Sequence, residues 1–314
     1  MKCPNCNKEV QPLWQVCPFC QYKPKRCSNN DCNTGWLPQN AHFCPKCGSP
    51  VAGEEDLNLR QRIENYISSV TSSGAGRNGS ANAGPDEEGT RTFTVNGVSF
   101  KMIKVEAGTF EMGDDEDDDC PTHEVTLTRD YYIGETPVTQ ALWEAVMGNN
   151  PSQFQGRNRP VENVSWNDCM EFVKKLKRLT NQDFRFPTEA EWEFAARGGN
   201  SSEGYEFAGS DDLDDVGWYN DNSDDETHPV KRKSANELGI YDMSGNVWEW
   251  CWDWYDSDYY DESPERNPTG AASGSSRVGR GGSWSIDAGG CRVALRFRVR
   301  PGTRYYDLGF RLAL

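Results

Sequence analysis

Eight of the twelve cysteines lie within the first 47 residues and form four closely spaced pairs. A short spacing such as Cys-x-x-Cys places two thiolates on one turn, and two such turns complete a tetrahedral sulfur site for zinc. The pattern predicts two structural zinc ions, because four thiolates leave no open position on the metal for catalysis. Four disulfides in a small secreted module are the competing interpretation. The eight predicted zinc ligands are Cys3, Cys6, Cys17, Cys20, Cys27, Cys32, Cys44 and Cys47.

A second candidate for chemistry lies near the end of the chain, where residues 281–291 read GGSWSIDAGGC. Its cysteine, Cys291, can serve as a nucleophile, as a metal ligand or as a small buried apolar residue. Three further cysteines lie outside the first 47 residues, at positions 120, 169 and 251. Of these, Cys169 falls on the apolar face of a predicted helix and is interpreted as a core residue.

Three helices are predicted among the elements that must position this segment. Thr139, Ser165 and Thr188 each stand just before a stretch with apolar residues at helical spacing, as N-cap residues do. An Asn-Gly pair at residues 96–97 predicts a hairpin between two short strands. Beyond residue 199 the chain is rich in Gly, Asp, Asn and Trp, which predicts ordered loops and short strands. Together these signals predict an α+β domain.

The composition divides the chain into three parts. Residues 1–52 hold the cysteine pairs, and residues 53–91 combine a short amphipathic helix with a flexible Gly- and Ser-rich linker. Residues 92–314 form the α+β domain.

Charge is distributed unevenly between these parts. The net charge of the chain is −16, but residues 1–52 hold six Lys/Arg and two Asp/Glu, a local charge of +4, so the remainder carries −20. A domain this acidic repels phosphate backbones, so nucleic acid is a poor partner for it. No stretch is long and apolar enough for a membrane span, and the first residues lack the apolar region of a signal peptide. We therefore expect a cytoplasmic protein.

Six motifs in the larger domain resemble one known family. They are FKMIKVEAGTFEMG (100–113), RPVENVSW (159–166), FRFPTEAEWEFAARGG (184–199), LGIYDMSGNVWEW (238–250), RVGRGGSW (277–284) and LGFRLAL (308–314). On these motifs the domain is identified as a member of the formylglycine-generating enzyme, or sulfatase-modifying factor, family. The resemblance implies a C-type-lectin-like fold with little regular secondary structure. Residues 1–52 resemble the double zinc ribbons attached to many bacterial and archaeal proteins.

The resemblance also implies a structural calcium ion. Carried over onto the loop YDMSGNVWE, the ligands are the side chains of Asp242 and Glu249 and the backbone carbonyls of Gly245 and Val247. Calcium accepts six to eight hard oxygen ligands from irregular loops. The alternative is that the two carboxylates hydrogen-bond loop amides without a metal.

Family members that are enzymes use a cysteine pair that binds copper(I) and activates oxygen. Aligned on the GGS-aromatic motif, the second cysteine matches Cys291, but the first matches Ile286, which cannot ligate a metal. Related iron-dependent sulfoxide synthases use histidines from an added helical domain, whereas this chain has three histidines in all. We therefore expect no catalytic residue. A metal-dependent oxidoreductase with an altered site, using Cys291, remains the alternative function.

The last segment also resembles the variable proteins of diversity-generating retroelements, whose final segment is diversified and displayed as a ligand surface. This resemblance implies a binding module for a protein or another macromolecular ligand. Arg and Ala positions would anchor the segment, and the residues between them would face outward. Period-two alternation alone suggests the opposite, with Val293, Leu295, Phe297 and Val299 in the core. Following the resemblance, the predicted ligand-binding residues are Ile286, Asp287, Gly289, Gly290, Val293, Leu295, Phe297, Val299, Tyr305 and Tyr306.

Overall fold

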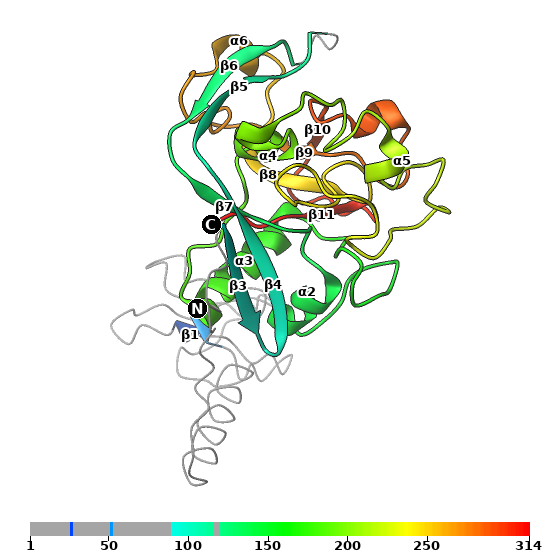
Figure 1. Ribbon diagram of the computed structural model, residues 1–314. Helices are drawn as coiled ribbons and strands as arrows, with labels where there is room; N and C mark the ends of the chain where they lie inside the picture. Colours follow the sequence, from blue (N-terminus) through cyan, green and yellow to red (C-terminus); the bar gives the residue numbers. More distant parts are fainter. Residues whose placement is uncertain (1–25, 28–50, 53–88, 116–119) are drawn as a thin grey trace, which may run out of the picture. The chain divides into compact units, whose positions relative to one another are not determined.

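The computed structural model describes residues 26–27, 51–52, 89–115 and 120–314 (Figure 1). The chain splits into two compact units, Met1–Arg77 and Asn78–Leu314, and this boundary falls inside the predicted linker. In the first unit, β1 (Arg26–Cys27) pairs antiparallel with β2 (Val51–Ala52). Seven of the eight predicted zinc ligands lie outside the described residues, as do the predicted short helix and most of the linker. For Cys27 only the backbone is described.

The largest sheet of the second unit carries the segment with Cys291. Its strand order is β10-β9-β8-β11. The strands β10, β9 and β8 pair antiparallel, whereas β11 runs parallel to β8 and closes the other edge. This arrangement brings the end of the chain beside a strand more than fifty residues earlier. The strands are β8 (Trp248–Trp254), β9 (Arg277–Arg280), β10 (Arg296–Val299) and β11 (Leu308–Phe310).

Among the described residues of the second unit, two smaller sheets precede it in the chain. The first has the order β3-β4-β7, from β3 (Thr90–Val95), β4 (Val98–Val105) and β7 (Tyr131–Gly134). The second pairs β5 (Gly108–Met112) with β6 (His123–Leu127). The turn between β3 and β4 is the predicted hairpin, because Asn96 and Gly97 both take positive φ, at 48° and 82°.

All three predicted helix starts are confirmed. The helices are α2 (Gln140–Met147), α3 (Trp166–Thr180) and α4 (Glu189–Ala196), with Thr139, Ser165 and Thr188 as N-caps. Ser165 and Thr188 each form a capping box, which satisfies two backbone N–H groups reciprocally. The described part of the domain also contains four single-turn elements: η1 (Gly199–Ser201), α5 (Leu213–Val216), α6 (Tyr259–Glu262) and η2 (Ala288–Cys291).

The domain is α+β with modest regular secondary structure, and its core joins helices and sheets. In Figure 1, α4 lies beside β8 and β9, and it contacts both. Cys169 is fully buried on α3 in the cluster that includes Phe172 and Trp143, so its interpretation as a core residue is confirmed. Within the described residues, no helix is long and apolar enough to cross a membrane.

Candidate functional site: a cavity formed by the C-terminal segment

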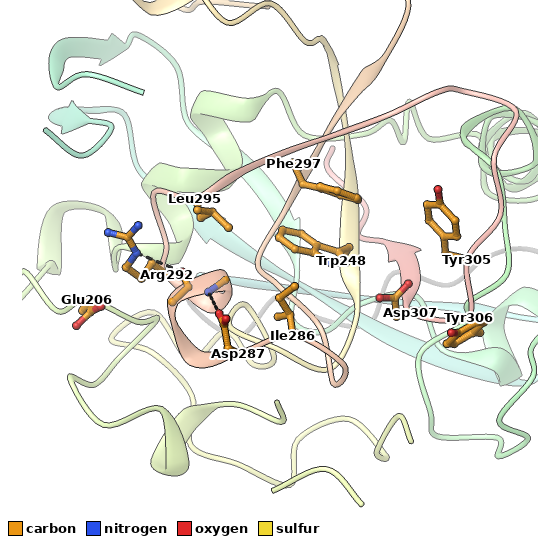
Figure 2. A pocket seen from close by; sticks show the side chains of 12 residues that line it. Glu206, Trp248, Ile286, Asp287, Arg292, Leu295, Phe297, Tyr305, Tyr306 and Asp307 are labelled. Atoms are coloured by element: carbon orange, nitrogen blue, oxygen red, sulfur yellow. Dashed lines mark hydrogen bonds between the residues drawn. The ribbon is translucent and has the colours of Figure 1, made fainter. Parts of the chain in front are cut away.

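A cavity of about 820 Å³ opens on the domain, and the C-terminal segment forms most of its wall (Figure 2). Eight of the ten predicted ligand-binding residues line it: Ile286, Asp287, Gly289, Gly290, Leu295, Phe297, Tyr305 and Tyr306. Glu206, Trp248, Arg292 and Asp307 complete the lining. The structure therefore brings together residues that lie up to 21 positions apart in the final segment, together with two from an earlier loop and strand.

Two stacked aromatic rings form the apolar floor. Figure 2 shows the side chains of Trp248 on β8 and Phe297 on β10 face to face. Their ring centroids lie 4.7 Å apart, with an interplanar angle of 27°. The strand between them contributes Gly279, which pairs with Phe297 and has no side chain to separate the two rings. A Cβ at this glycine would already lie 3.5 Å from the Phe297 ring. Half-buried Leu295 and Ile286 extend the apolar surface.

The prediction of a ligand-binding role is wrong for two of the ten residues. Val293 is 2% exposed and Val299 is 4% exposed, and both lie in core clusters instead of the cavity wall. The backbone explains the first case, because residues 293–294 form a turn in which the Leu295 N–H donates to the Arg292 carbonyl. Val293 therefore does not share the orientation of the strand residues that follow. Val299 ends β10, where it packs in the cluster that contains Trp248.

Buried arginines anchor the cavity wall from behind, as the resemblance implied. Arg280 on β9 is fully buried and contacts Glu193 and Glu189, both on α4. It also donates to the carbonyls of Val293 and Ala294, 2.7 Å away in each case. Arg296 on β10 makes a two-pronged contact with Glu189 at 2.7 and 3.0 Å. The cation of each arginine is therefore compensated inside the protein, and the turn before β10 is tied to α4.

A second set of contacts holds the segment that presents Tyr305 and Tyr306. The Trp284 ring lies 5.8 Å from Tyr306, and its Nε1–H donates to the Tyr306 carbonyl at 3.3 Å. Asp307 Oδ2 accepts hydrogen bonds from the hydroxyl groups of Ser283 and Ser285, at 3.0 and 2.9 Å. The GGSW turn therefore holds in place the segment that carries the two tyrosines.

Cys291 lies beneath this turn and is buried. A Cβ at Gly282, which has φ +72°, would sit 2.5 Å from the Cys291 sulfur, so only glycine allows the turn to close over it. Burial raises the pKa of the Cys291 thiol to about 12. The thiol is therefore protonated at neutral pH. Ile286, the residue at the position of the partner cysteine, packs against the same small cluster.

The residues predicted to bind calcium are buried, and protein donors contact both carboxylates. Glu249 accepts hydrogen bonds from Arg311 and from the Trp192 indole, at 2.8 and 2.7 Å. Asp242 Oδ2 accepts from the backbone N–H of Lys231 at 2.9 Å, and its Oδ1 accepts from the Asn246 amide at 3.1 Å. Calcium binding at this loop stays a prediction.

Four lining residues were missed by the sequence reasoning. Trp248 lies in the YDMSGNVWEW motif and Arg292 follows Cys291 directly, so each stood beside a residue that had been singled out. Asp307 follows the two tyrosines. Glu206 belongs to a loop whose sequence has no recognisable pattern. A hydrogen bond of 3.1 Å from the Val293 N–H to the Glu206 carbonyl holds this loop beside the cavity.

The fold and the motifs place the chain in a family. Residues 91–314 match the model of the sulfatase-modifying factor enzyme 1-like domain, and the chain belongs to this family. Among solved structures it is similar to Treponema denticola variable protein 1, with 39% identity and a TM-score of 0.67 over 71% of this chain and 98% of that one. It is also similar to PvdO from Pseudomonas aeruginosa, with 26% identity and a TM-score of 0.59 over 68% and 93% of the two chains.

Two curated relatives carry different names. The chain is 35% identical over 237 residues to the chaperone protein LppX of Paenibacillus barcinonensis, covering 60% of this chain and 79% of that protein. It is 39% identical over 194 residues to the formylglycine-generating enzyme of Streptomyces coelicolor, covering 56% of this chain and 59% of the enzyme. The chain thus spans about three fifths of that enzyme's length. Membership of the family therefore leaves the activity open.

Proposed function

We propose that the C-terminal domain is a non-catalytic binding module that takes a protein or another macromolecular ligand in the cavity of about 820 Å³. One observation carries the proposal. The residues between the anchors line an apolar cavity, whereas the anchoring arginines are buried and paired with carboxylates behind it. Clefts of this size with an apolar lining and few polar groups are typical of ligand sites.

Because the residues that line the cavity differ from those that anchor the segment, the binding surface could vary without loss of the anchors. Substitutions at Ile286, Leu295, Phe297, Tyr305 or Tyr306 change the cavity wall but leave the arginine–carboxylate contacts in place. The similarity to a protein named variable protein 1 supports this interpretation. We infer that the segment displays a surface that is open to diversification, as in retroelement variable proteins.

The alternative is a metal-dependent oxidoreductase, which is supported by the 39% identity to a formylglycine-generating enzyme. That chemistry would need a thiolate at Cys291 and a second ligand beside it. The thiol is buried with a raised pKa, and Ile286 stands at the second position. These two observations favour the binding module.

We further propose two structural zinc ions in residues 1–52 and a cytoplasmic location. For the predicted calcium ion, the test is a comparison of the melting temperatures with and without chelator.

The experiment that tests the binding function uses a phage-displayed library of random peptides, selected on the immobilised full chain. Recovered peptides are synthesised and their Kd is measured on the wild type and on variants. Phe297→Ala should weaken binding about tenfold or more, because aromatic anchors dominate interface energies. Cys291→Ser should change the Kd little.

Two outcomes would overturn the binding module. The first is a selection that recovers no peptide, or only peptides that bind Phe297→Ala as well as they bind the wild type. The second is stoichiometric copper(I) binding with oxygen-dependent turnover that disappears in Cys291→Ser, which would establish the oxidoreductase.

A further inference from the structure

We propose that the partner inserts a positively charged side chain next to an aromatic or large aliphatic anchor. This inference rests on the proposed binding function and specifies the chemistry of the segment that the cavity takes. It follows from the charges of the lining residues and from their pairing.

Three carboxylates line the cavity, and none is neutralised. Glu206, Asp287 and Asp307 all belong to the lining, and among the residues that the structure describes no Lys or Arg forms an ion pair with any of them. Asp287 accepts from the Gly290 N–H as the N-cap of η2, and Asp307 accepts from two serine hydroxyls. These neutral donors leave the negative charge of each carboxylate in place.

The single cation of the lining is already engaged. Arg292 contacts Asp114 at 2.6 Å, and its Nε–H donates to the Gly289 carbonyl at 3.2 Å. In Figure 2 Arg292 lies on the same side of the cavity as Asp287 and Glu206, whereas Asp307 lies across the cavity beside the tyrosines. The unpaired charge of the cavity is therefore negative on both sides of an apolar floor.

A second cavity on the same domain differs in how its carboxylates are paired. That cavity, of about 710 Å³, also has carboxylates in its lining, but Glu191 is held by a two-pronged contact with Arg185 at 2.6 and 2.7 Å. Its other carboxylate, Asp130, pairs with Lys104 at 2.8 Å. The negative charges of the second cavity are thus matched within the domain, and those of the first are not.

The aromatic residues suit a cation as well as an apolar anchor. Tyr305 and Tyr306 are 45% and 53% exposed, which makes them two of the few large hydrophobic side chains that the domain exposes. Tyrosine faces attract guanidinium and ammonium groups, and the Trp248–Phe297 floor offers apolar area to a neighbouring side chain. The charge of −20 outside residues 1–52 would also speed the approach of a basic partner.

Glu206 allows a clean test because its side chain is exposed and has no partner in the described structure. The experiment uses the peptides recovered by the phage selection, labelled with fluorescein, and measures fluorescence polarisation. We expect the recovered peptides to carry Lys or Arg within two residues of an aromatic or large aliphatic residue. Replacing that basic residue by Gln should weaken binding to the wild type.

The matching changes in the protein are Glu206→Gln and, as control, Glu124→Gln on β6, an exposed carboxylate that does not line this cavity. Glu206→Gln should raise the Kd of the basic peptide about two- to fivefold, as expected for one partly exposed charge pair. It should change the Kd of the Gln-substituted peptide less than it changes the Kd of the basic peptide. Raising the salt concentration should weaken only the basic peptide.

The outcomes separate this inference from the function on which it rests. If the peptides lose binding in Phe297→Ala but contain no basic residue, or bind Glu206→Gln and the control equally well, the site stands and the charge preference is wrong. If Phe297→Ala has no effect on any peptide, the binding function itself fails.

Discussion

At the scale of one residue, the buried carboxyl group of Glu162 positions the loop under the tyrosines, and its burial costs free energy. The residue is fully buried, and its Oε1 accepts the Phe154 N–H at 2.8 Å, whereas its Oε2 has no hydrogen-bond partner in the described structure. The Phe154 ring in turn packs against Trp284 and Tyr306. Desolvation raises the pKa of Glu162 from its ordinary value of 4.5 to about 7, and the nearby charge of Asp307 contributes in the same direction.

This raised pKa predicts a pH dependence of stability. Between about pH 4.5 and 7 the folded protein holds a proton on Glu162 that the unfolded chain has lost. The contribution of this residue to the free energy of unfolding therefore falls as the pH rises, by up to about 1.4 kcal/mol per pH unit. Glu162→Gln should remove that slope, and urea unfolding of both proteins at pH 5 and pH 7 measures it. Equal slopes in the two proteins would contradict the prediction.

Neighbouring residues of the final segment should differ sharply in their effect on stability. Val293→Ala creates a gap in the core and should lower the free energy of unfolding by about 2 kcal/mol. Tyr306→Ala truncates a side chain that is 53% exposed and should cost less than about 1 kcal/mol. Chemical denaturation of the two variants measures the difference. A similar loss in both would mean that Tyr306 is part of the core.

At the scale of elements, one cluster of charges connects α4 to β9 and β10. Glu189 contacts both Arg280 and Arg296, and all three side chains are almost completely buried. Removing one member of such a cluster leaves charge uncompensated in a medium that solvates it poorly. The cluster therefore sets the position of the cavity wall relative to the helix.

We expect Glu189→Gln to destabilise the domain by about 3–5 kcal/mol, because Arg296 loses its buried counter-charge. Thermal unfolding followed by circular dichroism measures the loss, with Glu124→Gln as the exposed control. The variant should also weaken peptide binding at temperatures where it is still folded, since β10 carries Phe297. A melting temperature equal to that of the control would show that the cluster contributes little.

At the scale of the whole molecule, the two compact units should behave independently. The boundary between Met1–Arg77 and Asn78–Leu314 falls within a stretch rich in Gly and Ser. Tethering a zinc-stabilised module through such a linker would leave the binding domain free to fold without metal.

Whether the last segment is diversified is tested by sequencing the neighbouring DNA. Diversification predicts a reverse transcriptase gene and an imperfect repeat of the last segment there.

Metal analysis of the full chain should find two zinc ions, bound by the eight cysteines of the first 47 residues. Chelation should unfold residues 1–50 and leave the thermal transition of the larger domain unchanged. Loss of both parts together on chelation would show that the units depend on each other. Mass spectrometry under non-reducing conditions distinguishes the zinc sites from the competing set of four disulfides.

Sequence alone determined the family, the three helix starts, the β3–β4 hairpin and eight of the residues that line the cavity. These features depend on local chemistry, such as capping, turn residues and motif order, which a sequence states directly. The resemblance to retroelement variable proteins also implied that arginines anchor the final segment, and Arg280 and Arg296 do so.

Tertiary structure alone decided which face of the final segment is buried. Period-two alternation assumes one continuous strand, and the turn at residues 293–294 breaks it, so Val293 enters the core whereas Leu295 lines the cavity. Likewise, no sequence pattern states that Phe297 reaches across Gly279 to Trp248, or that Arg311 contacts Glu249. These outcomes depend on contacts between segments far apart in the chain, and only the packed domain brings those segments together.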